Sequence, residues 1–556
     1  MLRRLRLLMA AVSTPTRTVV LVGAESAGKT CLAAALAGRT GRPLNVAGAT
    51  TALESFDDGD VRYVDSPGLV RHLDTATTAT TLQALRDRAD DVLLLVVRAT
   101  DLDGDLAVLL PLAAGRHAVV AVTHWDRVAT TAHAPAALST LRAHLGVPVV
   151  ALDARRRGPA LADLRTAIDA AAPLPALPAV PRIGWRVQPA PGLLERPLVG
   201  PPLALMALLG PAAGVVAAAV ALAGRLDPVV TQALTPLAAA ADRLPPVAAA
   251  VVAGDYGLLT MGPLLLVWAA PVVLALAALL GVLKASGLLD RLASAVDPLL
   301  RPVGLGGRDL VRVVAGFGCN VPAVVSTRSC ATCSRDATVG AIAFGSACSY
   351  QLGATVAVLS AAGRPGLVLP YLGLLLTGML VHARLLARRS PARHLDIALL
   401  SGRAFLTRPR WVDVRREMGG VLRHVGLRAL PVFALITVMA AVLAVTGLLD
   451  VLARSLSPLL AALRLPGEAA LPVVLASVRK DGLLLLAEPD VAAAMDGAQL
   501  LAALVLAGAL LPCLVTALTI ARERGRRVAA RLVTRQAALA LVLAATISWI
   551  GPVVVR

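Results

Sequence analysis

An eight-residue segment near the start of the chain has the glycines, lysine and hydroxyl group of a phosphate-binding loop. Gly23-Ala-Glu-Ser-Ala-Gly-Lys29-Thr30 fits the pattern G-x-x-x-x-G-K-[ST]. An apolar run at 18–22 precedes it and a helical stretch at 31–38 follows it, which is the context that such a loop requires. We expect Lys29 to reach the β- and γ-phosphates of a nucleoside triphosphate and Thr30 to bind Mg²⁺. The residues expected to cradle the phosphates through backbone N–H groups are Gly23, Ser26, Ala27 and Gly28.

Two further motifs favour a GTPase over a general ATPase. Asp65-Ser-Pro-Gly68 follows the run at 61–64 and matches D-x-P-G. Asp65 is expected to act on Mg²⁺ through a water molecule, and Gly68 to meet the γ-phosphate. Asn45-Val-Ala-Gly-Ala-Thr50 lies between the phosphate loop and Asp65, where a switch segment belongs. Thr50 is therefore the candidate for a second Mg²⁺ ligand.

A guanine base is expected to bind where two later strands end. Thr123-His-Trp-Asp126 stands where N-K-x-D belongs, with Thr123 in place of the usual Asn. Asp126 would accept hydrogen bonds from the N1–H and N2–H₂ groups of guanine. Asp153-Ala-Arg-Arg-Arg-Gly158 stands in the place of the base-clamping loop, so the Ala154 N–H is the candidate contact to guanine O6. GTP and Mg²⁺ are the predicted cofactors, and no catalytic group is assigned.

The elements that position these residues belong to the first of two unlike parts of the 556-residue chain. Residues 1–172 read as an α/β P-loop domain, because short apolar runs alternate with charged helical stretches, which is typical of a parallel sheet covered by helices. Residues 173–202 form a Pro-rich linker, expected to be extended and stiff. Residues 203–556 are predicted to be an all-α polytopic membrane domain.

The composition agrees with a membrane protein. Hydrophobic residues make up 57% of the chain, charged residues 16%, and the mean hydropathy is +0.75. These values exclude a purely cytosolic or disordered protein. The net charge of +19 comes almost entirely from Arg, since Lys occurs only at 29, 284 and 480. We interpret this excess as arginines that flank membrane segments and expect no nucleic-acid partner, while membrane lipid is an expected partner.

Seven apolar stretches in the second part have about the ~17–25 residues that cross a bilayer. Two more segments, at 309–327 and 469–487, are interrupted by polar residues, Gly or Pro and read as broken or re-entrant pieces. The seven uninterrupted stretches lie near residues 203–224, 258–283, 338–361, 366–386, 429–449, 499–520 and 536–553.

The membrane part contains an internal duplication. The segment 287–300 aligns without gaps with 447–460, and nine of the fourteen positions are identical. The two gate-type repeats extend over about 261–327 and 421–487. The loops at 384–428 and 522–535 are rich in Arg and are therefore expected to be cytoplasmic. Placing both loops and 284–312 inside leaves three crossings between the repeats, so the repeats are predicted to be inverted.

The interruption in the first repeat is the most informative membrane site. Pro322 in Gly316-Phe-Gly-Cys-Asn-Val-Pro322 lacks an N–H, so a helix is expected to break near Gly318. Irregular backbone at membrane depth is tolerated where it is buried in protein or lines a cavity. Cys319 and Asn320 could bind a borderline-soft cation there, with Cys348 as the candidate second sulfur. A packing kink with an inert buried cysteine is an equally open interpretation.

Taken together, the motifs resemble the ferrous iron transport protein B family, in which a bacterial GTPase is fused to a metal-transporting membrane domain. Gly316–Ala323 resembles its first gate motif, and Pro512-Cys-Leu-Val-Thr516 resembles a later P-C-x-x-T motif. The resemblance implies Fe²⁺ uptake across the cytoplasmic (inner) membrane, with the G domain in the cytoplasm. It also suggests two partners, a small cytosolic accessory protein and a second copy of the chain.

Several positions depart from the family pattern and keep alternatives open. Ser26 stands where potassium-stimulated members carry Asn, and Lys284-Ala285 replace an acidic pair. The same fold could transport another ion or a small solute, or the protein could be a nucleotide-sensing membrane regulator without transport. Cys330-Ala-Thr-Cys333 could be two ordinary thiols or a pair with a redox or metal-handover role, because one C-x-x-C cannot close a four-ligand site.

Overall fold

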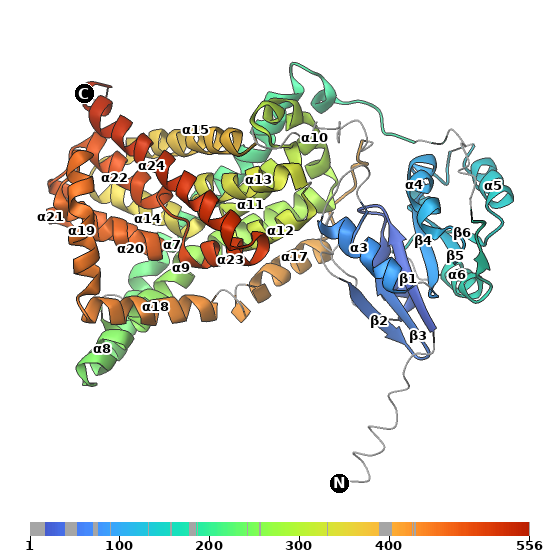
Figure 1. Ribbon diagram of the computed structural model, residues 1–556, viewed down its shortest axis with the longest axis horizontal. Helices are drawn as coiled ribbons and strands as arrows, with labels where there is room; N and C mark the ends of the chain where they lie inside the picture. Colours follow the sequence, from blue (N-terminus) through green and yellow to red (C-terminus); the bar gives the residue numbers. More distant parts are fainter. Residues whose placement is uncertain are drawn as a thin grey trace, which may run out of the picture.

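The computed structural model has a sheet domain and a larger helical domain that lie side by side (Figure 1). The predicted division into an α/β part and an all-α part is confirmed. The described residues are 17–38, 53–69, 76–88, 90–131, 133–155, 158–176, 185, 187–241, 243–254, 257–330, 332–387, 403–424, 426–427 and 430–554.

The sheet has the strand order β2-β3-β1-β4-β5-β6, and β7 pairs with β5. The pairs β1–β3, β1–β4, β4–β5 and β5–β6 are parallel, as the sequence predicts. The edge strand β2 and the short β7 are antiparallel, which the apolar runs did not reveal. The strands are β1 (Arg17–Gly23), β2 (Glu54–Asp58), β3 (Val61–Asp65), β4 (Val92–Arg98), β5 (His117–Thr123), β6 (Val149–Ala151) and β7 (Ala172–Pro173).

Helices cover both faces of this sheet, because side chains alternate along each central strand. On β1, Val20 and Val22 pack with α3, α4 and α5, whereas Val19 and Leu21 pack with α2 and α6. All four of these β1 side chains are fully buried. The helices are α2 (Lys29–Leu36), α3 (Ala76–Asp87), α4 (Leu102–Leu109), α5 (Ala134–Leu145) and α6 (Pro159–Asp169), with short 3₁₀ turns η1 (Leu110–Ala113) and η2 (Trp125–Arg127).

Part of the predicted Pro-rich linker packs on the sheet domain. The indole of Trp185 is 9% exposed, and its Nε1 donates to the Ala99 carbonyl at 2.6 Å. Val187 N donates to the Thr100 carbonyl at 3.0 Å. Trp185 and Val187 of the predicted linker therefore lie against the sheet domain, because a large apolar ring gains more by burial than by exposure. A 3₁₀ turn, η3 (Leu193–Glu195), follows before the first long helix.

The helical domain is built from long helices and several short, paired ones. Its first half contains α7 (Gly200–Ala241), α8 (Pro246–Ala253), α9 (Leu258–Ala285), α10 (Leu288–Leu300), η4 (Arg301–Val303), α11 (Gly307–Gly316), α12 (Asn320–Ser326), η5 (Thr327–Ser329), α13 (Thr332–Gly345), α14 (Ser349–Ala361), η6 (Pro365–Leu367) and α15 (Val368–Ala387). Its second half contains α17 (Trp411–His424), α18 (Leu430–Val445), α19 (Leu448–Ala462), η8 (Gly467–Ala469), α20 (Ala470–Val478), η9 (Lys480–Ala487), α21 (Pro489–Ala493), α22 (Gly497–Ala509), α23 (Leu514–Arg524) and α24 (Arg526–Val554).

Five helical segments among the described residues are long and apolar enough to cross a membrane, and a bent pair makes a sixth. The protein is therefore a multi-pass membrane protein. The five are 200–241, 266–285, 334–361, 365–387 and 526–551, and the bent pair is α22 with α23, which meet at 41°.

Four of the predicted membrane segments differ from expectation. The segment expected at 499–520 is the bent pair of α22 and α23. Helix α7 has 42 residues, because the helix continues through Pro211, Pro228 and Pro236. Neighbouring groups can satisfy the backbone around a proline inside a membrane helix. The segment expected at 429–449 forms α18, which at 16 residues falls short of a full crossing. The segment expected at 338–361 contains a break between α13 and α14.

The duplicated segments fold alike. Gly287 precedes α10 with φ 73°, and Gly447 precedes α19 with φ 70°. A left-handed glycine at the start of each helix turns the chain sharply after α9 and after α18. Helix α10 lies at the end of the helical domain that faces the sheet, whereas α19 runs across the far end (Figure 1). This placement is the one that inverted repeats would produce.

Candidate functional site

The backbone of the phosphate loop is shaped by two residues with positive φ. Ser26 has φ 62°, and Gly28 has φ 89° as the N-terminal cap of α2. Gly23 leaves no room for a side chain, since an added Cβ would lie 2.4 Å from the Val96 carbonyl oxygen. The loop therefore turns tightly from β1 into α2, with the backbone N–H groups at the helix N-terminus available for an anion.

Lys29, Thr30 and Asp65 meet beneath this loop. Lys29 Nζ donates to the carbonyls of Gly23 and Ala24 at 3.0 and 2.9 Å, and the side chain is 6% exposed. Burial lowers the pKa of the Lys29 amine, and the carboxylates of Asp65 and Glu25 oppose that shift. Thr30 Oγ1 donates to Asp65 Oδ2 at 2.5 Å. A hydroxyl and a carboxylate oxygen are the hard donors that Mg²⁺ prefers, so this pair fits that ion.

The D-x-P-G segment packs directly on the phosphate loop. Leu69 N donates to the Gly23 carbonyl at 3.0 Å, and Glu25 N donates to the Leu69 carbonyl at 3.3 Å. Ser66 Oγ anchors the segment to the Leu21 carbonyl at 2.7 Å. A Cβ added to Gly68 would lie 2.7 Å from the Glu25 Cα, so only glycine allows this approach. The two motifs therefore form one continuous surface.

The expected base-binding residues lie at the same edge of the sheet. Thr123 Oγ1 donates to the Ala27 carbonyl at 2.7 Å, so the residue that replaces Asn braces the phosphate loop. A Cβ added to Gly28 would lie 3.7 Å from the Ala154 Cβ. Asp153 Oδ1 accepts from Arg155 N at 2.9 Å, which orients the loop that carries Ala154. Asp126 lies in η2, the 3₁₀ turn that begins directly after His124, and His124 has a φ of 56°.

The structure does not address every predicted nucleotide residue. Thr50 and the rest of the segment 45–50 lie outside the described residues. The other predicted residues meet at one edge of the sheet, from β1, β3, β5, α2 and the loop after β6.

In the helical domain, the helix break falls where the sequence predicts it. Helix α11 ends at Gly316, and α12 begins at Asn320, with Cys319 as its cap. Pro322 lies in the first turn of α12, where a missing N–H costs no helical hydrogen bond. The proline is therefore compatible with a new helix start, and the chain has already left the helix at Cys319.

Three of the helices that follow a break begin directly after a cysteine. Cys319 precedes α12, Cys348 precedes α14 and Cys513 precedes α23. The sequence analysis quoted Cys513 only as part of a motif, although Pro512 before it is the same signal of a break as Pro322.

Asn320 also faces this region. Its Nδ2 donates to the Ser346 carbonyl at 3.3 Å, and its buried Oδ1 has no hydrogen-bond partner among the described residues. No group of three or more His, Cys, Asp or Glu side chains that could hold a metal ion occurs in the described part of the chain. The chemistry available at this break is therefore that of thiols, an amide oxygen and backbone carbonyls.

The corresponding break in the second repeat carries two cations. Arg479 lies between α20 and η9, and Lys480 is the first residue of η9; the two residues are 4% and 7% exposed. Lys480 Nζ donates to the carbonyls of Ala507, Gly508 and Leu511 at 3.1, 2.7 and 2.7 Å. These carbonyls belong to the end of α22 and the bend that follows it, so the ammonium group caps a broken helix.

Cys330 has a structural environment. It is 3% exposed, and its thiol donates to Asp309 Oδ1 at 3.3 Å. The side chain of Cys333 lies outside the described part of the structure.

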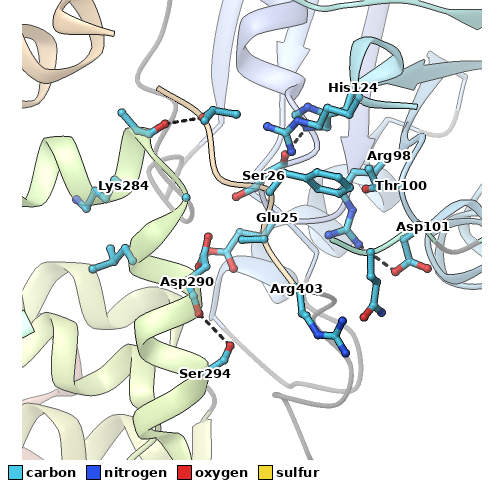
Figure 2. A pocket seen from close by; sticks show the side chains of 18 of the residues that line it. Glu25, Ser26, Arg98, Thr100, Asp101, His124, Lys284, Asp290, Ser294 and Arg403 are labelled. Atoms are coloured by element: carbon cyan, nitrogen blue, oxygen red, sulfur yellow. Dashed lines mark hydrogen bonds and ion pairs between the residues drawn. The ribbon is translucent and has the colours of Figure 1, made fainter. Parts of the chain in front are cut away.

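A cavity of about 220 Å³ separates the phosphate loop from the helical domain. Glu25 and Ser26 line it on one side and Lys284 and Asp290 on the other (Figure 2). The sequence analysis did not single out Glu25, which occupies a variable position of the loop motif. Its partner Arg308 is 283 residues away in the chain, so no local signal could have paired them.

The fold and the site define a class of protein: a phosphate-binding α/β domain of GTPase type is joined to a membrane domain of broken and duplicated helices. The family model described as ferrous iron transport protein B matches residues 17–168, and the gate model, described as nucleoside recognition, matches 266–362 and 426–527. The chain belongs to the ferrous iron transport protein B family.

Curated relatives are similar over a short segment. The Fe(2+) transporter FeoB of Legionella pneumophila is 42% identical over 59 residues, which are 11% of this chain and 8% of the relative. The Fe(2+) transporter FeoB of Synechocystis sp. is 49% identical over 49 residues, which are 9% of this chain and 8% of the relative. The aligned segments thus span about a twelfth of each relative's length.

Solved structures that are similar to this chain include NFeoB and the cytosolic domain of a FeoB iron transporter. The mGMPPNP-bound NFeoB from S. thermophilus is 25% identical with a TM-score of 0.25, and the match covers 28% of this chain and 61% of that one. The cytosolic domain of the T. maritima FeoB iron transporter in its GMPPNP form is 20% identical with a TM-score of 0.22, over 28% and 63% of the two chains.

Proposed function

We propose that this protein binds and hydrolyses GTP in its sheet domain and uses that cycle to drive or gate uptake of a divalent metal, with Fe²⁺ as the substrate. The observation that carries the proposal is the presence, in one chain, of a phosphate loop closed against D-x-P-G and of three helices in the membrane domain that begin at cysteines. The relatives named Fe(2+) transporter support the choice of ion.

The nucleotide residues have the roles that their positions suggest. Lys29, now bound to two loop carbonyls, is the cation nearest to where the phosphates would lie. Thr30 and Asp65 would hold Mg²⁺, which screens the phosphate charge when bound. Asp126 and the Ala154 N–H would read the guanine base. Thr50 is retained as a further Mg²⁺ ligand on the sequence pattern alone.

The metal would pass the first helix break. Cys319, Asn320 and Cys348 supply the ligands in this proposal, and the unpartnered Asn320 Oδ1 supports it. A thiol and an amide oxygen suit a borderline cation such as Fe²⁺ better than a hard one.

The proposal places the chain in the bacterial inner membrane with the sheet domain in the cytoplasm, where GTP is available. The Arg-rich segments 384–428 and 522–535 would then be cytoplasmic. Two proposed partners follow from the family: a small cytosolic accessory protein and a second copy of this chain.

The test uses the full chain reconstituted in liposomes loaded with GTP and Mg²⁺. Uptake of Fe²⁺ is measured with Mn²⁺ and Zn²⁺ as competitors, beside the Lys29→Ala variant. We expect Fe²⁺ uptake to depend on GTP and to be lost in Lys29→Ala, because the phosphate charge loses its nearest cation. GTP binding by Lys29→Ala that equals that of the unchanged protein would contradict the phosphate-loop assignment.

A second experiment tests the choice of base. Asp126→Asn should reduce the preference for GTP over ATP, since the amide no longer accepts two hydrogen bonds from guanine. If the unchanged protein binds ATP as tightly as GTP, the segment Thr123–Asp126 does not recognise guanine.

A small organic solute is a second candidate substrate. The buried cations Arg479 and Lys480 favour it, since a fixed positive charge in the gate repels a metal ion. The description of the gate model as nucleoside recognition is in line with this candidate. Uptake of a radiolabelled nucleoside without Fe²⁺ uptake in the same liposomes would favour this second function.

A further inference from the structure

Arg308 connects the phosphate loop with the first gate repeat. It is the second residue of α11, and its Nη1 donates to Glu25 Oε2 at 2.9 Å. Its Nη2 donates to Asp290 Oδ1 of α10 at 3.3 Å. The guanidinium group therefore lies between two carboxylates, one from each domain. Figure 2 shows Glu25 and Asp290 facing each other across the domain boundary.

Glu25 marks the end of the nucleotide site where the γ-phosphate is expected. It packs against Gly68, since a Cβ added to Gly68 would lie 2.7 Å from the Glu25 Cα. Its backbone N–H bonds to Leu69, directly after the D-x-P-G motif. Gly68 is the residue proposed to meet the γ-phosphate, so a group bound to Glu25 stands next to the reacting phosphate.

The guanidinium has room to move. The Arg308 side chain is 38% exposed and lines the same cavity of about 220 Å³ as Glu25 and Ser26. Three more arginines, Arg98, Arg127 and Arg155, line the cavity on the sheet side. A cavity with this excess of positive charge attracts an anion such as a triphosphate.

We propose that Arg308 is an arginine finger, which α11 of the first gate repeat supplies to the nucleotide site of the same chain. This inference rests on the proposed GTP hydrolysis. Without nucleotide, the Glu25 carboxylate holds the guanidinium beside the loop. With GTP bound, the guanidinium turns to the γ-phosphate, whose oxygens accept the same paired N–H donors as a carboxylate. It then stabilises the charge that develops on the transferred phosphoryl group.

The reaction balances without a further reagent. A water oxygen forms a bond to the γ-phosphorus, while the bond from that phosphorus to the β–γ bridging oxygen breaks. The bridging oxygen keeps the electron pair and leaves with GDP. The proton released from the attacking water passes to a phosphate oxygen or to solvent, so GTP and water become GDP and inorganic phosphate.

This assignment gives the two domains a direct connection. Arg308 is the second residue of α11 (Gly307–Gly316), and Cys319 lies in the break, three residues after the end of that helix. When the guanidinium exchanges Glu25 for phosphate, the contact that ties the N-terminus of α11 to the phosphate loop changes. The state of the nucleotide is thereby communicated to the first gate break.

The test measures GTP turnover by the full chain in liposomes for Arg308→Ala and Arg308→Lys. Binding of GDP with aluminium fluoride, which imitates the transferred phosphoryl group, is measured in parallel. Arg301→Ala and Arg301→Lys are the matched controls, since Arg301 pairs with Asp297, four residues earlier in α10, at 2.7 Å and does not line the cavity.

We expect both Arg308 variants to lose turnover by about 10³-fold, with GTP affinity nearly unchanged. Both should fail to bind GDP with aluminium fluoride. Lysine should not rescue, because an ammonium group lacks the planar fork of donors. The Arg301 variants should behave like the unchanged protein. Glu25→Gln should raise turnover, because the carboxylate no longer competes for the guanidinium.

A purely structural clamp between the domains predicts a different pattern. Lysine would then bridge Glu25 and Asp290 well enough to restore turnover, and aluminium fluoride binding would persist. Turnover by Arg308→Lys equal to that of the unchanged protein overturns the inference, and its melting temperature shows that the variant is folded. Absence of GTP binding in the unchanged protein overturns the proposed function itself, which is a distinct result.

Discussion

The two gate repeats share a backbone plan but differ in the chemistry of their breaks. Each repeat turns at a left-handed glycine, Gly287 or Gly447, and each then breaks a helix at the same place in the repeat. The first break presents the thiol of Cys319 and the amide of Asn320. The second break presents Arg479 and Lys480, both buried.

The difference shows two ways of satisfying a broken helix. Carbonyls at the end of an interrupted helix need a donor or a cation, since water is scarce at membrane depth. Around the second break, the Lys480 ammonium group supplies that cation from the chain itself. The first break offers a thiol and an amide oxygen that has no hydrogen-bond partner among the described residues, and these atoms could bind a metal cation that enters the protein. We infer that the duplication produced the shared backbone of the two repeats, and that later divergence placed a fixed positive charge at the second break.

The largest expected effect concerns the orientation of the repeats. Ser294 and Arg454 occupy equivalent positions, 160 residues apart, and both are exposed. In closed vesicles with the sheet domain inside, a membrane-impermeant maleimide should label Arg454→Cys. Ser294→Cys should react only after the membrane is opened, because inverted repeats place these positions on opposite faces.

The parent chain, with its six native cysteines, is the control whose background labelling is subtracted. Labelling of both variants from the same face would contradict inversion. The two repeats, and with them the two breaks, would then have the same orientation in the membrane.

The next effect tests the fixed charge. Lys480→Met keeps the length of the side chain but leaves three buried carbonyls without their common donor. We expect a loss of about 3 kcal/mol in stability, which thermal unfolding in detergent should reveal as a lower melting temperature. Lys284→Met is the matched control, because Lys284 pairs with Glu417 where both side chains keep contact with solvent. Equal losses in the two variants would show that Lys480 is not a cap.

The sequence predicted the parts that local signals specify. The strand–loop–helix unit around Lys29 follows from one contiguous motif, and the start of α12 after Cys319 follows from Pro322. The break at Ser346–Cys348 was not predicted, because no proline or charge marks it within an apolar run. Conversely, α7 continues beyond the predicted segment 203–224, through Pro228 and Pro236.

Contacts between distant segments were beyond the sequence. Glu25 and Arg308 meet only because the sheet domain docks on the first gate repeat. No pattern in the Pro-rich linker indicates that Trp185 bonds to the Ala99 carbonyl after β4. A variable residue in a motif carries no signal of its partner. The roles of Asp126, Ala154 and Cys348 remain predictions from the pattern, which the geometry now allows to be tested.

A smaller effect is expected from Cys319→Ser. The change retains size and polarity but replaces a soft ligand with a hard one, so Fe²⁺ uptake should fall about tenfold. Stability should barely change, because the residue caps a helix and is only partly buried. Cys330→Ser is the control, since Cys330 bonds to Asp309 away from the break and should leave uptake unchanged. Wild-type uptake by Cys319→Ser would return the first break to a packing role.

The smallest effect compares the two turns that begin the repeated helices. Alanine in the left-handed region costs about 1 kcal/mol of stability. Gly447→Ala should lose this amount and no more, because nothing lies within 4 Å of the added Cβ and no clash is added. Gly287→Ala should lose more, because its Cβ would lie 2.6 Å from the Phe405 carbonyl oxygen, in the segment that packs beside the cavity. Thermal unfolding of both variants in the same detergent measures the difference. Equal losses would show that the chain around Phe405 yields without cost, and that the first repeat is held no more tightly than the second.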